Sequence, residues 1–194
     1  MSDKNNKDSF RELESAEEEL GRLRKKVAAL RKQLIPEEIE DYDFINADGN
    51  IVRLSDLFGD KNDLIVIHNM GRKCPYCTLW ADGFNGIYQH LENRAAFVVI
   101  SHDSPETMKV FAESRNWKFR ILSNDGGPFT RDMGYEDESG SPQPGISTFH
   151  RNENGMVHRI SHTSFGPGDD FCAVWHILDM LKDSAAGWAP KFNY

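Results

Sequence analysis

An α/β fold, with one central sheet between two layers of helices, is predicted by three features of the sequence. Short apolar runs typical of buried strands alternate with segments of helical periodicity through the middle of the chain. Two further runs flank a Gly-containing turn and predict an antiparallel hairpin. A long charged segment precedes them all. We therefore expect an N-terminal charged helix in residues 1–36 and an α/β domain in residues 37–194.

The N-terminal helix is predicted to run from about residue 8 to residue 35, where Pro36 ends it. Its apolar residues follow a heptad spacing, at Leu13, Ala16, Leu20, Leu23, Val27, Leu30 and Leu34. Such a stripe suits a helix that pairs with another chain, but it also suits a helix that lies on its own domain. Both alternatives stay open, and a homodimer through residues 10–35 is one expected arrangement.

The domain elements follow from turn chemistry and periodicity. An Asp-Gly turn between short apolar segments predicts the first hairpin, and continuous apolar runs predict strands buried on both faces. In chain order the predicted elements are a hairpin at 42–54, a helical turn at 55–59, strand 64–67, helix 75–93, strand 96–100, helix 104–116, strand 119–122, an irregular connection at 123–145, a hairpin at 146–160 and a helix at 169–183. A parallel half, an antiparallel hairpin and a closing helix form the thioredoxin-like arrangement, so we expect a thioredoxin-like three-layer α/β/α sandwich with an N-terminal hairpin.

Composition narrows the classes of partner and location. The formal net charge of −8 argues against nucleic acid or an anionic membrane, because both bind basic patches. No apolar run approaches the roughly 18 residues of a membrane span. The first residues have no apolar segment typical of a signal peptide, so the default expectation is the cytoplasm. Three cysteines do not make a secreted disulfide scaffold.

The pair Cys74 and Cys77 lies where a buried strand turns into a helix. Cys74 is therefore expected at the helix N-terminus, where free N–H groups and the helix dipole stabilise a thiolate. Arg72 and Lys73 add positive charge, and Pro75 suits the first helical turn. This placement predicts a redox-active dithiol in which Cys74 attacks a disulfide and Cys77 resolves the mixed intermediate. The expected substrate is a disulfide-containing protein or a small thiol or disulfide, and no cofactor is expected.

The stretch from Cys74 to Gly86 resembles the signature of a largely uncharacterised bacterial family, with the pattern Cys-Pro-x-Cys-x-x-Trp-Ala-Asp-x-Phe-x-Gly. Members of that family are described as predicted dithiol-disulfide oxidoreductases of thioredoxin-like fold. The resemblance extends over most of the chain, including the N-terminal helix and the segments 54–58 and 145–149. It implies a thioredoxin-like fold and a working dithiol, with Trp80 and Asp82 in supporting places. Trp80 is expected in the core, and Asp82 is either a proton carrier for Cys77 or a carboxylate on the helix surface.

Comparison with thioredoxins adds candidates for substrate binding. Thioredoxins carry a cis-proline just before the strand that faces their dithiol, and Ile146 falls at that position here. We therefore assign Gly145 and Ile146, together with Pro75 and Tyr76 of the motif, as candidate substrate-binding residues. Cys-Pro-Tyr-Cys is also the glutaredoxin active-site sequence, although the other signals for glutathione binding are not recognisable.

Two other functions remain open. Aligning residues 64–77 with the peroxiredoxin motif puts Cys77 on the peroxidatic cysteine, with Cys74 in the place of a threonine and Met70 in the place of a proline. A peroxiredoxin-like peroxidase that uses Cys77 is therefore an alternative. The other is a non-catalytic thioredoxin-fold interaction protein presented by the N-terminal helix.

The remaining reactive side chains are expected to play ordinary roles. His158 and His162 have a spacing found in metal sites, but four residues of a strand span about 13 Å, so no metal site is expected. They are predicted, with His150, to be surface residues of the hairpin. His68 closes the buried strand before the motif and either modulates the thiolates or is structural. Cys172 is expected to be a small buried hydrophobic residue.

Overall fold

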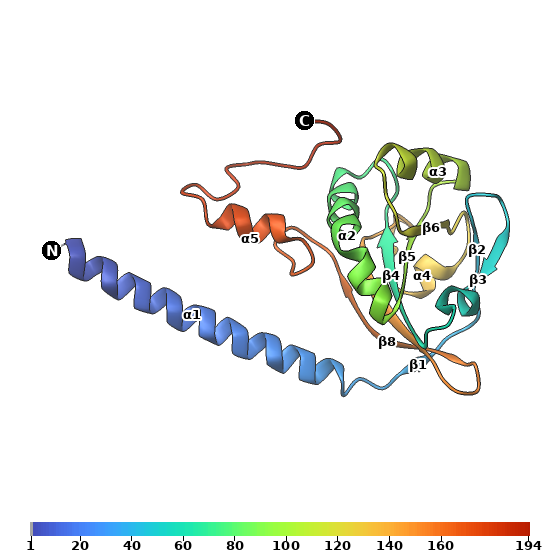
Figure 1. Ribbon diagram of the computed structural model, residues 1–194, viewed down its shortest axis with the longest axis horizontal. Coiled ribbons are helices and arrows are strands. Elements are labelled where there is room, and N and C mark those ends of the chain that lie inside the picture. Colours follow the sequence, from blue (N-terminus) through green and yellow to red (C-terminus); the bar gives the residue numbers. More distant parts are fainter. Residues whose placement is uncertain (1) are drawn as a thin grey trace. The chain divides into compact units, whose positions relative to one another are not determined.

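The computed structural model describes residues 2–194 and divides the chain into two compact units, one that ends at Pro36 and one from Glu37 to Tyr194 (Figure 1). Helix α1, Ser2–Arg31, makes up most of the first unit. It ends earlier than expected, because the N–H groups of Gln33 and Leu34 bond the carbonyls of Leu30 and Arg31 in turns. Leu34 therefore lies outside the helix. No helix in the described residues is long and apolar enough to cross a membrane.

The second unit is built on an eight-stranded sheet in the order β1-β8-β7-β4-β5-β6-β2-β3. Its strands are β1 (Glu37–Glu38), β2 (Asp43–Ile45), β3 (Ile51–Arg53), β4 (Asp63–Asn69), β5 (Ala96–Ser101), β6 (Arg120–Ser123), β7 (Gly145–Arg151) and β8 (Val157–Ser164). Strands β4, β5 and β6 are parallel, and β7 runs antiparallel to β4, with β8 beyond it. Both predicted hairpins and the parallel half are present.

Five helical segments accompany the sheet: η1 (Leu54–Phe58), α2 (Pro75–Arg94), α3 (Pro105–Ser114), α4 (Phe129–Asp132) and α5 (Ala173–Asp179). The sequence missed α4, a single turn within a Gly- and Pro-rich connection, and β1, which pairs with β8 over two residues. Helix α5 is shorter than predicted. Helix α4 and strand β1 are too short to show a periodic pattern in the sequence, so tertiary packing alone determines that they form.

The helices cover the two faces of the sheet unequally (Figure 1). Right-handed crossovers from β4 to β5 and from β5 to β6 advance in one direction, so α2 and α3 lie on the same face. Ile67, Phe97 and Val99 point into that layer, which also contains α5. On the other face Val66 and Val98 pack against η1, α4 and the β2–β3 hairpin. The predicted thioredoxin-like α/β fold is confirmed. The helical segments in the layer opposite α2 and α3 are the short η1 and α4.

Candidate active site

The loop that delivers the cysteines is held at the carboxyl end of the parallel strands. After β4 ends at Asn69, the side-chain Oδ1 of Asn69 accepts the Gly71 N–H at 2.8 Å. The carboxylate of Asp103 accepts the Arg72 N–H at 2.5 Å. Gly71 has φ +101°, and a Cβ there would lie 2.7 Å from the Asp103 carboxylate. Only glycine therefore fits this approach, and the loop enters α2 in one defined conformation.

Cys74 is the N-cap residue of α2. Its backbone is extended, at φ −96° and ψ 106°, and its sulfur accepts the Cys77 N–H at an N···S distance of 3.1 Å. The Cys74 carbonyl accepts both the Thr78 N–H, at 3.1 Å, and the Thr78 hydroxyl, at 3.0 Å. Pro75 occupies the first helical turn, where a missing N–H costs nothing. The strand-to-helix placement inferred from the sequence is the one observed.

Cys77 lies one turn further on and is only 3% exposed, whereas Cys74 is half-buried. The Met70 N–H donates to the Cys77 sulfur at 3.4 Å. A hydrogen bond from the Cys77 thiol, with backbone N–H donors of Cys77 and Tyr76, lowers the pKa of Cys74 to about 6. The same hydrogen bond to Cys74, followed by burial, raises the pKa of Cys77. As the pH rises, the half-buried Cys74 therefore loses its proton first, while the buried Cys77 keeps its proton.

The two basic side chains before the motif act less directly than expected. Arg72 and Lys73 are exposed, so solvent screens their charge. The low pKa of Cys74 comes instead from the Cys77 thiol and from backbone donors. The sequence analysis did not predict that the Cys77 thiol lowers the pKa of Cys74, because the spacing of two cysteines does not show which way the second sulfur points.

Tyr76 and Trp80 join the motif to the C-terminal segment. The Tyr76 ring stacks against that of Trp175 on α5, with centroids 6.1 Å apart and an angle of 27° between the ring planes. Trp80 is buried and packs against Phe165, which follows β8, at 5.2 Å. Trp80 is thus part of the core. Tyr76 itself is half-buried.

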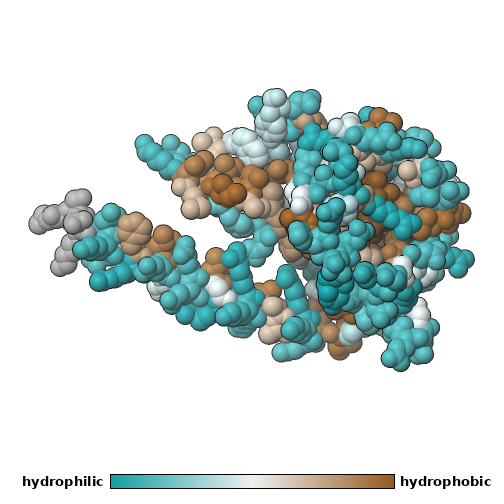
Figure 2. Space-filling view, viewed as in Figure 1, coloured by the Kyte–Doolittle hydropathy of each residue, from teal (hydrophilic) through white to brown (hydrophobic). Residues whose placement is uncertain are grey.

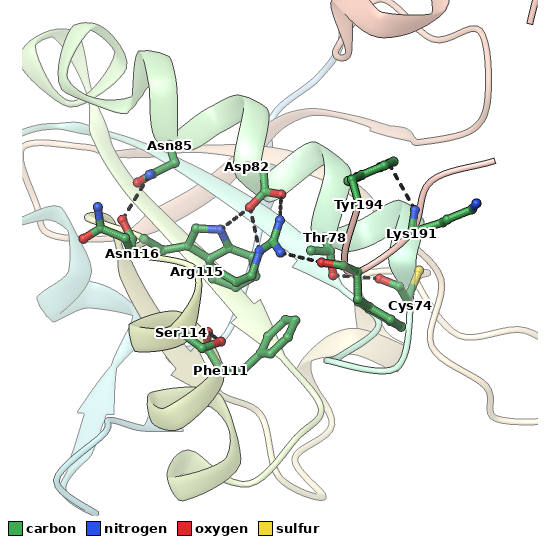
Figure 3. Close-up of polar contacts among 12 residues, drawn as sticks. Cys74, Thr78, Asp82, Asn85, Phe111, Ser114, Arg115, Asn116, Lys191 and Tyr194 are labelled. Carbon is green, nitrogen blue, oxygen red and sulfur yellow. Dashed lines mark hydrogen bonds and ion pairs between the residues drawn. The ribbon is translucent and has the colours of Figure 1, made fainter. Parts of the chain in front are cut away.

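Asp82 points toward Arg115, at the end of α3 (Figure 3). Its carboxylate forms an ion pair with Arg115 and accepts the Trp117 indole N–H at 2.8 Å. Arg115 also donates to the Phe192 carbonyl at 2.8 Å. The carboxylate therefore links α2 to the residues that follow α3, and Arg115 in turn links them to the chain near Phe192. Neither sequence alternative for Asp82 included this network, since its partners lie far along the chain.

Gly145 and Ile146 begin β7, next to β4. Gly145 pairs in register with His68, and Ile146 pairs with Ile67. A Cβ at Gly145 would overlap the ring of Tyr135, whose hydroxyl donates to the Ile146 carbonyl at 2.7 Å. The half-buried Ile146 side chain joins the same apolar cluster as Tyr76. Of the two, Ile146 contributes a side chain on the face of the sheet where α2 lies.

His68 lies on the opposite face of the sheet from α2. It is 2% exposed, stacks on the Tyr135 ring with centroids 3.7 Å apart, and has its Nε2 3.0 Å from the Ser147 hydroxyl. Burial, followed by the positive charge of Arg159, holds the pKa of His68 well below its usual value. His68 is therefore neutral near pH 7. Its side chain contacts Ser147 on β7 and lies on the face of the sheet away from α2, where the thiols are.

The other candidates of the sequence analysis lie apart from the dithiol. His158 and His162 are on β8, and His150 on β7 bonds Asp63 at 2.7 Å. Among residues 2–194 no three His, Cys, Asp or Glu side chains are grouped to hold a metal ion. Cys172 is the buried N-cap residue of α5, and all three cysteines are free thiols.

The fold and the cap geometry define a thioredoxin-like protein with a paired thiol site at the start of α2. The chain belongs to the family described as "Bacterial protein of unknown function (DUF899)", whose model matches residues 2–185. It is also 29% identical over 136 residues to the chloroplastic Peroxiredoxin Q of Sedum lineare, covering 70% of this chain and 72% of that protein. The match to the Gentiana triflora protein of that name covers 59% of its length.

Solved structures point to the same fold. The peroxidoxin BcpB of Mycobacterium tuberculosis is 25% identical, with a TM-score of 0.54 over 66% of this chain and 84% of that one. The reduced Prx3 of Vibrio vulnificus, solved in complex with H2O2, has a TM-score of 0.57 at 15% identity, over 70% of this chain and 90% of that one. The Sedum lineare relative and the peroxidoxin BcpB support a thiol-dependent redox enzyme, while the Prx3 likeness shows the fold.

Proposed function

We propose that this protein is a thiol-disulfide oxidoreductase in which Cys74 is the nucleophile and Cys77 the resolving thiol. The observation that carries the proposal is the contrast between the two sulfurs. Cys74 is half-buried with a pKa of about 6, so it is a thiolate at neutral pH, whereas Cys77 is buried with a raised pKa. A non-catalytic interaction protein would have no need of this division between the two thiols.

The reaction proceeds in two exchanges. The Cys74 thiolate attacks one sulfur of a substrate disulfide, forms a Cys74 mixed disulfide and releases the other sulfur as a thiolate. Cys77, once it loses its proton, attacks the Cys74 sulfur and releases the second substrate thiolate. The substrate gains two electrons, and the enzyme is left with a Cys74–Cys77 disulfide. A thiol or dithiol donor must then reduce that disulfide, which suits a compartment such as the cytoplasm where thiols are kept reduced.

A second candidate function is peroxide reduction, and the peroxiredoxin relatives favour it. Here too Cys74 is proposed as the attacking thiol, because it is the half-buried residue of the pair and has the lowered pKa, whereas the sequence alignment places Cys77 on the peroxidatic position. The Cys74 thiolate would take one oxygen from a hydroperoxide, become a sulfenic acid and release an alcohol or water. Condensation with the Cys77 thiol would then release water and form the same disulfide.

One set of variants tests both functions. The proposal predicts that the wild type and Cys172→Ser reduce a protein disulfide such as insulin in the presence of dithiothreitol. Cys74→Ser should be inactive, and Cys77→Ser should accumulate mixed disulfides on Cys74, detectable by mass spectrometry. Parallel assays of hydrogen peroxide consumption decide between the substrates. Full disulfide reduction by Cys74→Ser would refute the assignment of the nucleophile.

A further inference from the structure

The N-terminal helix carries an apolar stripe that a single helix cannot cover. The stripe residues are exposed by 44% to 53%, and they are Leu13, Leu20, Leu23, Val27 and Leu30. Apolar side chains interrupt the charged surface along α1 (Figure 2). An isolated helix of this kind is marginal in water, because its stability in proteins comes mainly from burying such a face. The seven-residue repeat suits a partner helix, which would bury the narrow stripe.

The charges that flank the stripe are divided between the two halves of the helix. Acidic residues flank its first half, at Glu12, Glu17 and Glu19. Basic residues flank its second half, at Arg24, Lys26 and Arg31. These are the positions that face the charged residues of a partner helix in a two-stranded coiled coil. The helix is therefore complementary to a copy of itself that runs the other way.

We propose that α1 pairs with α1 of a second copy of this chain in an antiparallel coiled coil. The register places Leu20 opposite the partner's Leu23 and Leu13 opposite the partner's Leu30. Between these layers Ala16 lies opposite the partner's Val27. Every residue in these layers lies within α1, Ser2–Arg31, so the end of the helix at Arg31 removes no contact from the proposed interface.

The same register also places residues of opposite charge beside each other. Counting outward from the Leu20–Leu23 layer brings Glu17 beside the partner's Arg24 and Glu19 beside the partner's Lys26. Two-fold symmetry repeats each contact, so opposite charges meet on both sides of the stripe. In a parallel pair Glu12 would instead face the partner's Glu17, and Lys26 would face the partner's Arg31. Only the middle contact, Glu19 with the partner's Arg24, would join opposite charges, so the like charges at both ends disfavour that orientation.

Association is tested by sedimentation of the full chain. We expect a dimer at tens of micromolar, and we expect Glu17→Lys/Glu19→Lys to raise the dissociation constant by about tenfold or more at low salt. The control Glu14→Lys/Glu18→Lys makes the same change in charge on the outer face and should leave the dimer intact. An equimolar mixture of Glu17→Lys/Glu19→Lys with Arg24→Glu/Lys26→Glu should form heterodimers. A monomeric wild type, as a helix covered by its own domain would give, overturns the proposal, and so does equal weakening by the control.

Orientation is tested by cross-linking in a Cys74→Ser/Cys77→Ser background. One chain carries Leu13→Cys and the other carries Leu30→Cys. The antiparallel register predicts that the mixture gives a disulfide between the two variants, whereas neither variant alone links to itself. Linking of Leu13→Cys to its own copy in place of the mixed product would show a parallel pair and overturn the proposed orientation. Mass spectrometry identifies the products.

Discussion

The backbone N–H of Cys77 donates to the sulfur of Cys74 at 3.1 Å, while the thiol of Cys77 forms a second hydrogen bond to the same sulfur. One residue therefore stabilises the Cys74 thiolate in two ways, and only one of them depends on its side chain. The backbone donor is fixed by the first turn of α2, so it survives any substitution other than proline that leaves the helix intact. The thiol donor can be removed by mutation.

Cys77→Ala removes the thiol donor and should raise the pKa of Cys74 above its value of about 6, while the remaining backbone donors keep it below the ordinary thiol value. Cys77→Ser keeps a hydroxyl donor and should raise the pKa less. The rate of Cys74 alkylation as a function of pH measures both, with Cys172→Ser as the control. Superimposable profiles for the wild type and Cys77→Ala would mean that the second sulfur does not tune the first.

Asp82→Asn should lower the free energy of unfolding by about 1–2 kcal/mol, because it breaks the ion pair with Arg115. The figure is modest because both side chains are partly exposed, by 25% and 34%. Urea unfolding measures the change, and Glu92→Gln on the exposed side of α2 is the matched control. Turnover per folded molecule should not change. A fall in turnover with unchanged stability would instead make Asp82 a proton carrier.

His68 should make stability depend on pH in a definite direction. Its folded-state pKa lies well below its usual value, so the unfolded chain binds a proton that the folded chain does not. The free energy of unfolding should therefore fall as pH drops below about 6.5, by up to about 1.4 kcal/mol per pH unit.

The slope should be smaller in His68→Phe, which does not titrate, and should persist in His176→Gln, a change at an exposed histidine on α5. Denaturant unfolding at a series of pH values measures the difference. Equal slopes for the wild type and His68→Phe would contradict a neutral buried histidine.

Gly145→Ala should destabilise the domain by about 1–3 kcal/mol. A Cβ there would overlap the Tyr135 ring and lie 2.7 Å from the Thr163 carbonyl oxygen, so the start of β7 must shift. Gly83→Ala in α2 is the control, because its Cβ would meet no atom within 4 Å and should stabilise the helix by about 0.5–1 kcal/mol. Thermal unfolding compares the two. Similar melting temperatures would mean that β7 is not held by this contact.

Sequence patterns located the dithiol but could not describe all that surrounds it. The junction of strand and helix at Cys74 follows from a buried apolar run and a proline in the first turn, both local signals. The partner of Asp82 could not be predicted, because Arg115 lies 33 residues away and only the packing of α3 beside α2 brings it near. The face of the sheet toward which His68 points could not be predicted either, because it depends on the register of β4 with β7.

The reduction potential of the Cys74–Cys77 couple tests the central claim most directly. Thiolate stabilisation favours the reduced form, and a Cys74 pKa of about 6 lies between those of thioredoxin and of the oxidant DsbA. Titration against glutathione or dithiothreitol buffers should therefore give a two-electron couple between about −270 mV and −120 mV. The oxidised product should contain one Cys74–Cys77 disulfide with Cys172 free. Failure to form that disulfide under any buffer, or oxidation that joins Cys172 instead, would contradict the account.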